Sequence, residues 1–318
     1  MNERQAIRIV EVGARDGLQN ETAMVPTAAK VAFVDVLSSS GVSEIEVSAF
    51  VSPRKVPQMG DAGDVFAGMR RTKGVVYSAL VPNVQGLDRA LSAGVDKVAV
   101  FTAASETFNR KNINTSVQGS LERFRPVVKR ARDMGLPVRG YLSAAFWCAF
   151  EGRIAPDAVV DLTRRLFDLG IGEVSLSDTI GKARPEEVAG LLERLLPHTS
   201  PERIAGHFHD TYGRGVVNTL TAYAHGIRVF DASVGGLGGC PFAPGATGNV
   251  ATEAVVAALR GHGADVGVDL DRLEEARRRL DPFLRDDRRR PPGPDAQACA
   301  VCEFYTGKDC CGPREAAS

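Results

Sequence analysis

Residues 156–179 read "PDAVVDLTRRLFDLGIGEVSLSDT" and contain, in order, the parts of one repeating unit. Over 156–169 the apolar residues recur with the period of an amphipathic helix. Gly170 follows, as glycine often does where a helix ends. Residues 173–176 then form a short apolar run typical of a buried strand, with the polar "SDT" close behind. The stretch therefore predicts a helix that leads into a strand and then a polar loop.

The same order of segments recurs along most of the chain. Strands are predicted over residues 7–12, 44–47, 75–80, 97–101, 138–142, 173–176, 204–208 and 229–234. Amphipathic helices are predicted over 27–39, 120–134, 156–169 and 185–196, and helix-ending glycines are Gly41, Gly94, Gly135, Gly170 and Gly226. Eight such units in 318 residues predict a closed (β/α)8 TIM barrel. A doubly wound sheet is disfavoured, because no Gly-rich dinucleotide fingerprint follows the first strand.

The charge and the cysteines exclude some classes of protein. Lys plus Arg and Asp plus Glu both number 39, so neither nucleic acid nor an anionic membrane is an expected partner. No stretch reads as a signal peptide or a transmembrane helix. The six cysteines are spread unevenly and do not resemble the disulfide framework of a secreted domain. These features favour a reduced, cytoplasmic protein.

The regular pattern stops near Leu284. We therefore expect a barrel catalytic domain over residues 1–285, followed over 286–318 by a Pro- and charge-rich linker and a cysteine-containing tail. The tail cysteines are Cys299, Cys302, Cys310 and Cys311. They could bind zinc or form redox-sensitive disulfides, but the adjacent pair is awkward for one ion and the tail has no histidine. A flexible appendage is the favoured interpretation.

Residues whose side chains could act in catalysis or bind a metal ion fall at the ends of the predicted strands. Catalytic residues of a barrel come from the C-terminal ends of its strands. The candidates at those positions are Arg15, Asp16, Glu46, Asp178, His207, His209, Cys240 and Asn249. One such residue alone would mean little, but several at one face indicate a site.

His207 and His209 could bind a metal ion together. Residues two apart in a strand point to the same face, so both imidazoles can converge inside the barrel mouth. An isolated pair of this kind is more often two buried histidines bonded to the backbone. Asp16, two strands away in a closed barrel, and Asn249, in the next loop, add oxygen atoms. The mixture suits Mg²⁺ or Mn²⁺ and argues against structural zinc.

Arg15 and Cys240 could act beside such an ion. Arg15 stays charged and can stabilise an enolate, or it could simply pair with Asp16 or Glu46. Cys240 lies in the Gly-rich loop 235–249, "GGLGGCPFAPGATGN". A thiol on a mobile loop can move a proton when the loop closes, unless it is inert.

Three acids are candidates for supporting roles, namely Glu46, Asp178 and Glu253. Glu253 follows Asn249 by four residues at a predicted helix start, so the two should share a helix face. Glu253 could then support a ligand, or it could be an ordinary acid of a first helical turn.

Six motifs together resemble the hydroxymethylglutaryl-CoA lyase family. They are, in chain order, "VEVGARDGLQNE", "FVSPRKVPQM", "KNIN", "SLSDTIG", "HFHDTYG" and "GLGGCPFAPGATGNVATE". The resemblance covers residues from about 9 to about 270, most of the chain. It implies a metal-dependent barrel, related to isopropylmalate and homocitrate synthases. The expected partner is an acyl-CoA, a 3-hydroxy-3-methylglutaryl thioester, which is cleaved to acetyl-CoA and acetoacetate.

The resemblance also implies a role for each candidate. The metal ligands would be Asp16, His207, His209 and Asn249. Arg15 would stabilise the enolate of the departing acetyl thioester, and Cys240 would take part in proton transfer from the closing loop. Glu46 and Glu253 would be supporting acids. The base that deprotonates the hydroxyl could be Asp16 or a histidine, and the final acid Cys240 or His207. We also expect a homo-oligomer, either a dimer or a tetramer.

Trp147 departs from the family pattern. It lies in "FWCAFEG" (146–152), where the family usually reads closer to "GCPYEG". A bulky side chain at the catalytic face could reshape the acyl pocket, so the acyl chain stays open. The alternatives are a lyase for another 3-hydroxy-3-carboxymethyl acyl-CoA, a Claisen-condensing synthase of the same barrel family, and a non-catalytic binding protein. The last should lack a metal ligand, yet all four candidates are present.

Overall fold

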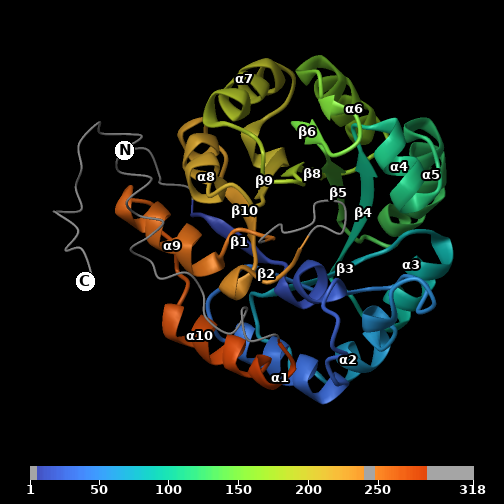
Figure 1. Ribbon diagram of the computed structural model, residues 1–318. Coiled ribbons are helices and arrows are strands. Elements are labelled where there is room, and N and C mark those ends of the chain that lie inside the picture. Colours follow the sequence, from blue (N-terminus) through green and yellow to red (C-terminus); the bar gives the residue numbers. More distant parts are fainter. Residues whose placement is uncertain (1–5, 240–247, 285–318) are drawn as a thin grey trace, which may run out of the picture.

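The strands form a closed parallel barrel. The computed structural model describes residues 6–239 and 248–284. Neighbouring strands follow the order β1-β10-β9-β8-β5-β4-β3-β2. They are β1 (Arg8–Glu11), β2 (Glu44–Ala49), β3 (Val76–Leu80), β4 (Lys97–Ala103), β5 (Val138–Ser143), β8 (Glu173–Asp178), β9 (Ile204–Phe208) and β10 (Val229–Ala232). Figure 1 shows this ring of strands inside a ring of helices. The predicted (β/α)8 barrel is confirmed.

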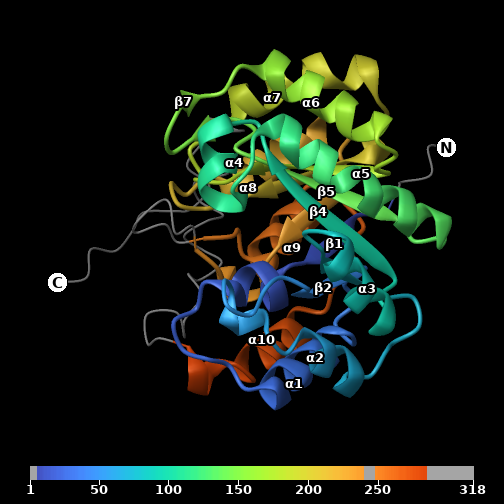
Figure 2. The same cartoon turned by 90° about the vertical axis from the view of Figure 1, so that its right-hand side faces the viewer.

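The helices cover the outside of the barrel. They are α1 (Thr27–Leu37), α2 (Ala62–Gly68), α3 (Val84–Ser92), α4 (Glu106–Ile113), α5 (Val117–Asp133), α6 (Pro156–Asp168), α7 (Pro185–Leu195), α8 (Gly215–Ala224), α9 (Thr252–Gly261) and α10 (Leu270–Arg278). The ring closes where α1 packs against α10, while α6 and α7 lie on the opposite side (Figures 1 and 2).

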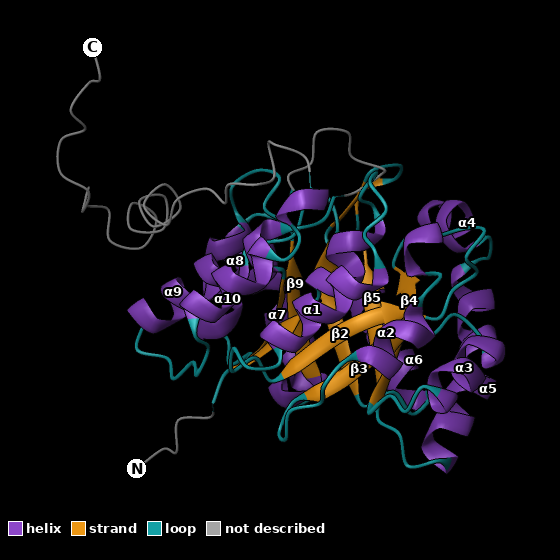
Figure 3. Cartoon of the chain, turned by 90° about the horizontal axis from the view of Figure 1, so that it is seen from below, coloured by secondary structure: helices purple, strands orange, loops and turns teal. Residues whose placement is uncertain are grey.

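An apolar stripe attaches each helix to the sheet, and α6 illustrates the pattern. Val159, Leu162 and Leu166 are buried, whereas Asp161 and Arg164 are exposed. Their spacing of three and four residues places the apolar side chains on one helix face. The layering that results, strands inside and helices outside, is visible from below in Figure 3. Among the described residues no helix combines the length and the apolar character needed to cross a bilayer.

Several predicted boundaries need correction. The helix predicted from residue 120 begins at Val117, because the side chain of Ser116 caps its first turn by accepting the Gly119 N–H. β8 runs through Asp178, which is therefore the last residue of a strand and not part of the following loop. An antiparallel hairpin that was not predicted, β6 (Trp147–Cys148) and β7 (Gly152–Arg153), follows β5. The predicted linker and tail, residues 286–318 with their four cysteines, lie outside the described residues.

Buried charges fill the N-terminal end of the barrel. Glu44, Lys97 and Glu173 are the first residues of β2, β4 and β8. Lys97 Nζ lies 2.9 Å from Glu44 Oε2 and 3.0 Å from Glu173 Oε1. Arg139 of β5 adds a second cation, with its Nε 3.4 Å from Glu173 Oε1. A buried charge without a partner would be strongly destabilising, so these residues depend on one another.

Candidate metal centre

Arg15 and Asp16 project from a π-helical turn directly after β1. The turn covers Gly13–Gly17 and is closed by i→i+5 hydrogen bonds. Single π-turns are rare and frequently occur at functional sites. Gly13 is needed because a Cβ at this position would lie 2.7 Å from Glu11 Oε1. The close approach of the chain to this carboxylate therefore shapes the turn that presents Arg15 and Asp16.

Glu11 holds the turn against the end of β10. Its Oε1 accepts the N–H groups of Gly13, at 2.9 Å, and Val234, at 3.0 Å. Its Oε2 accepts the Thr252 hydroxyl at 2.6 Å. Burial raises the pKa of Glu11 to about 8, against these hydrogen bonds that lower it. The residue joins three segments of the site and was not among the predicted candidates.

Asp16, His207 and His209 converge as predicted. One ligand atom from each side chain lies within 4.8 Å of the others. His207 belongs to β9 and His209 follows that strand, and their ring centroids are 5.3 Å apart. Both histidines are buried. Only β10 separates β9 from β1, so residues distant in sequence meet at one end of the barrel.

Asn249 joins this group through the backbone and through its side chain. It forms an isolated antiparallel bridge with His209. Its Nδ2 donates to Asp16 Oδ2 at 2.9 Å and to the Leu237 carbonyl at 3.0 Å. Both hydrogen bonds use the amide nitrogen, which leaves the amide oxygen as the atom that can bind an ion.

The predicted helix face shared by Asn249 and Glu253 is wrong. Helix α9 begins only at Thr252, because the residues before it are extended and bridge to neighbouring strands. Glu253 instead accepts the N–H of Gly235, with both carboxylate oxygens within 3.1 Å of that nitrogen. It therefore holds the turn after β10, and the sequence spacing alone could not distinguish this from a contact with Asn249.

Arg15 is held between two carboxylates and an aromatic ring. Its guanidinium donates to Glu46 Oε2 at 2.6 Å and to Asp16 Oδ1 at 2.5 Å. The guanidinium carbon lies 5.0 Å from the Tyr141 ring centroid, and the Tyr141 hydroxyl donates to Glu46 Oε2 at 2.9 Å. Burial alone would lower the pKa of Arg15, but Glu46 and Asp16 raise it well above its usual value. A permanent positive charge therefore lies beside the cluster of Asp16, His207 and His209.

A β-bulge helps to place Glu46. The register between β2 and β3 shifts between Glu46 and Ser48. Bulges bend a strand and redirect its side chains, and they are common next to active sites. Burial raises the pKa of Glu46 even though Arg15 lowers it.

His207 is held by an acid from the next strand. Asp231 lies opposite it in the β9–β10 register, and Asp231 Oδ2 is 3.1 Å from His207 Nδ1. The same oxygen accepts the Ser175 hydroxyl at 2.7 Å, and Asp231 Oδ1 accepts Arg139 at 2.5 Å. Burial alone would raise the pKa of Asp231, but Arg139 and His207 lower it to about 2. The acid is therefore ionised.

The charge states suit a divalent cation. Burial, together with His207, lowers the pKa of His209 to about 4, so its imidazole is neutral at physiological pH. Burial alone would raise the pKa of Asp16, but Arg15 and the histidines lower it below its usual value. His209 Nδ1 is buried and has no hydrogen-bond partner among the described residues. A buried orphan nitrogen beside a carboxylate and a second imidazole fits a metal ion.

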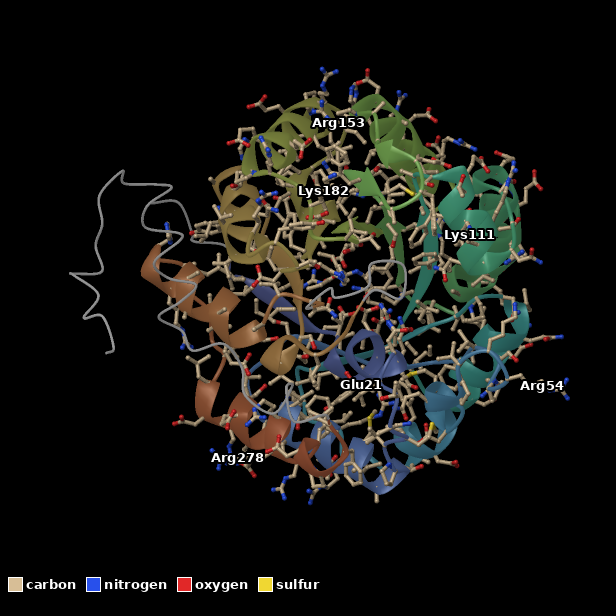
Figure 4. The ribbon with its side chains drawn as sticks, in the orientation of Figure 1. Glu21, Arg54, Lys111, Arg153, Lys182 and Arg278 are labelled. Carbon is tan, nitrogen blue, oxygen red and sulfur yellow. The ribbon has the colours of Figure 1, made fainter. Side chains whose placement is uncertain are left out.

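Asp178 and Trp147 lie around the loop that follows β8. Asp178 accepts the N–H groups of Lys182, at 3.1 Å, and Ala183, at 2.9 Å, and burial raises its pKa to about 7. Lys182 Nζ stands 4.1 Å from the Trp147 ring centroid, and Trp147 Nε1 donates to Glu187 at 3.0 Å. Figure 4 shows Lys182 inside the ring of helices, while Arg54 and Arg278 lie at its outer edge. Trp147 therefore packs on this loop and on α7.

The structure brings together six predicted site residues, namely Arg15, Asp16, Glu46, His207, His209 and Asn249. Cys240 lies outside the described residues. Sequence reasoning missed five residues of the site, namely Glu11, Gln19, Arg139, Tyr141 and Asp231. Gln19 belongs to the site because its Nε2 donates to Asp16 Oδ1 at 3.2 Å. Glu11, Arg139, Tyr141 and Asp231 carried a usable signal, because each is a polar or charged residue inside a predicted barrel strand.

The comparisons with known proteins agree on one family. The HMGL-like family model matches residues 6–280. The cytoplasmic 3-hydroxy-3-methylglutaryl-CoA lyase of Rattus norvegicus is 50% identical over 270 residues, 85% of this chain and 79% of that protein. The 3-hydroxy-3-isohexenylglutaryl-CoA/hydroxy-methylglutaryl-CoA lyase of Pseudomonas aeruginosa is 49% identical over 280 residues, 88% of this chain and 93% of that protein. The crystal structure of the HMG-CoA lyase from Brucella melitensis has a TM-score of 0.86 at 49% identity, covering 88% of this chain and 99% of that one.

Proposed function

The chain belongs to the hydroxymethylglutaryl-CoA lyase family, and we propose that it cleaves 3-hydroxy-3-methylglutaryl-CoA to acetyl-CoA and acetoacetate. The observation that carries the proposal is the convergence of Asp16, His207 and His209 at the barrel mouth, next to the buried cation of Arg15. Retro-Claisen cleavage needs a site that activates a tertiary alcohol and a second site that accepts the charge of a thioester enolate. The cluster and Arg15 supply these two functions side by side.

A divalent metal ion would be held by Asp16, His207, His209 and Asn249. Two imidazoles, a carboxylate and an amide oxygen form a donor set that suits Mg²⁺ or Mn²⁺. When bound, such an ion would lower the pKa of the substrate hydroxyl and bind a second substrate oxygen. The remaining chemistry belongs to the side chains around it.

Arg15 would stabilise the enolate of the departing acetyl thioester. Its charge is permanent, and Glu46 and Tyr141 fix its guanidinium in one place. A preorganised cation of this kind lowers the energy of a developing anion without having to reorganise during the reaction. Glu46 therefore acts through Arg15, as a residue that positions it.

Two proton transfers complete the reaction. Asp16 is ionised and lies within the cluster, so it is our candidate for taking the proton of the tertiary hydroxyl, with a histidine as the alternative. The enolate carbon must then receive a proton to become the methyl group of acetyl-CoA. Cys240, which follows β10 in the sequence, and His207 are the candidates for this acid.

The test is to incubate the purified full chain with 3-hydroxy-3-methylglutaryl-CoA and Mg²⁺ or Mn²⁺, and to measure acetyl-CoA and acetoacetate. We expect equimolar products that vanish when a chelator is present. Asp16→Asn should abolish the products. Asp133→Asn, at an exposed surface ion pair with Lys129, is the matched control and should not change them. An inactive wild type, or a fully active Asp16→Asn variant, would refute the proposal.

A second candidate function is cleavage of a larger 3-hydroxy-3-carboxymethyl acyl-CoA. The Pseudomonas aeruginosa relative is named for both an isohexenylglutaryl and a methylglutaryl thioester. The Trp147 ring contacts Lys182 Nζ, and the backbone N–H of Lys182 donates to Asp178 at the end of β8. Trp147 could therefore adjust the acyl pocket through the loop that follows β8. A panel of thioesters with longer 3-alkyl chains, assayed with wild type and Trp147→Ala, separates the two functions. Higher kcat/KM for a long chain in the wild type would favour the second.

We further propose that the active protein is a homo-oligomer, dimeric or tetrameric, in the cytoplasm. The cytoplasmic rat relative supports the compartment. Light scattering on the purified chain tests the first proposal, and a monomer would contradict it. Fractionation of the source cells tests the second.

A further inference from the structure

We infer that Asp231 is a positioning residue that fixes the tautomer of His207, so that Nε2 of this histidine is left to bind the ion. The inference rests on the proposed function only in assigning a divalent ion to the cluster. It concerns a residue of β10 that lies one strand away from the histidine and is not itself part of the ligand group.

The hydrogen bond between Asp231 and His207 has only one possible direction. A carboxylate without a proton can only accept, so His207 Nδ1, 3.1 Å from Asp231 Oδ2, must carry the hydrogen. A neutral imidazole with its proton on Nδ1 has a free lone pair on Nε2. Hydrogen-bonded acids commonly fix metal-binding histidines in this way.

The surroundings keep Asp231 ionised and in place. Arg139 donates to Oδ1 and the Ser175 hydroxyl donates to Oδ2, so both oxygens face donors. Asp231 is 2% exposed and Arg139 1%, which removes competition from bulk water. The His207 and Tyr141 rings also pack nearly perpendicular to each other, with centroids 6.1 Å apart, and this packing restricts rotation of the imidazole.

The two histidines of the cluster therefore differ. His209 Nδ1 has no hydrogen-bond partner among the described residues, so none of them selects its tautomer in the same way. Asp231 gives one ligand a defined orientation before any ion arrives.

Replacing Asp231 by asparagine should reverse the tautomer of His207. Arg139 only donates, so it will bind the amide oxygen of the new side chain and direct the amide nitrogen to the former place of Oδ2. This NH₂ group faces His207 Nδ1 and Ser175. His207 Nδ1 must then accept, its proton moves to Nε2, and the nitrogen needed by the ion is blocked. A carboxylate-to-amide change beside a histidine can impose the wrong tautomer.

Histidine nitrogen NMR tests the inference without metal or substrate. The chain has five histidines, and the His207 signals are those that a His207→Asn variant loses. At pH 8 the wild type should show a protonated Nδ1 and an acceptor-type Nε2 for His207. The opposite tautomer in the wild type would overturn the inference, and this measurement needs no variant that might fail to fold. Asp231→Asn should exchange the two nitrogen types, and an unchanged pattern in the folded variant would also overturn it.

Metal affinity supplies a second readout. Titration with Mn²⁺, followed by the EPR signal of the free ion, should show at least a roughly 10-fold weaker Kd for Asp231→Asn. The matched control is Glu173→Gln, which removes another buried acid that is ion-paired with Arg139 and hydrogen-bonded to Lys97, at the other end of the barrel from the metal ligands. This control should lose stability while it keeps both the tautomer and the Mn²⁺ affinity. An equal loss of affinity in both variants would mean that Asp231 acts only through folding. If 3-hydroxy-3-methylglutaryl-CoA is not cleaved but these results hold, the proposed substrate fails and the role of Asp231 stands.

Discussion

Replacing Arg15 by glutamine should leave a buried carboxylate without its cation. Glu46 is fully buried, and its partners are Arg15 at 2.6 Å and the Tyr141 hydroxyl at 2.9 Å. At an effective dielectric constant of about 20, the attraction between unit charges 2.6 Å apart is about 6 kcal/mol. Protonation and relaxation of Glu46 recover part of this. We therefore expect the free energy of unfolding to fall by about 3–5 kcal/mol at pH 8.

The loss should depend on pH in a defined direction. Burial raises the pKa of Glu46 already in the wild type, where Arg15 opposes the shift, so removal of Arg15 must raise it further. Below the unfolded pKa of about 4.3, Glu46 is protonated in the folded and in the unfolded state, so loss of its ion pair with Arg15 does not change the free energy of unfolding. As the pH rises through this value, the unfolded state ionises first and the variant loses stability. The part of the difference from wild type that is due to Glu46 should therefore be small at pH 4.5 and largest at pH 8, whereas the part due to Asp16, whose pKa Arg15 holds below its usual value, is already present at pH 4.5.

A double variant separates stability from catalysis. Arg15→Gln/Glu46→Gln removes both charges and should recover the part of the lost stability that is due to Glu46, while Asp16 loses its cation but keeps hydrogen bonds from Asn249 and Gln19. It should still release acetyl-CoA about 10²–10³-fold more slowly than wild type, since the cation beside the enolate is gone. Urea unfolding followed by circular dichroism, and acetyl-CoA release, give the two numbers. A single variant as stable as wild type at pH 8, or a double variant with wild-type activity, would refute the reasoning.

Two further predictions concern the neighbours of this pair. Asn249→Ala removes the proposed oxygen ligand and the donor to Asp16 Oδ2. Mn²⁺ binding, measured by equilibrium dialysis, should therefore weaken by about 10-fold or more. An unchanged Kd for Mn²⁺ would remove Asn249 from the ligand set. The pKa of Glu11 is raised to about 8, so folding opposes its ionisation, and this group makes the wild type less stable as the pH rises from about 4 towards 8. Glu11→Gln should therefore flatten the pH dependence of the unfolding free energy, and an equally steep curve would contradict the assignment.

The fold could be predicted from the sequence because the patterns that indicate it lie within short stretches of the chain. Helical period, helix-ending glycine and short apolar runs repeat along the chain, and eight such units without a dinucleotide fingerprint after the first strand favour a barrel over a doubly wound sheet. The ligands could be predicted for a similar reason. His207 and His209 share a face by strand geometry, and the barrel order places Asp16 near them.

The remainder of the site depends on contacts that no local pattern describes. The pairing of Arg139 with Asp231 spans 92 positions in the chain and exists only because the barrel is closed. The π-turn at Gly13–Gly17 depends on the approach of the backbone to a buried carboxylate. Asn249 was expected on a helix, but the extended segment that bridges to His209 delays the start of α9. Each of these is set by tertiary packing and not by the neighbouring residues.

We propose that residues from the π-helical turn after β1, from the end of β9 and from the segment before α9 form one divalent metal centre. Anomalous diffraction at the manganese edge from crystals grown with Mn²⁺ tests it most directly. We predict a single strong peak within bonding distance of an Asp16 carboxylate oxygen and of one nitrogen each from His207 and His209, and no such peak for Asp16→Asn. A peak elsewhere, or no peak at this cluster at saturating Mn²⁺, would contradict the account.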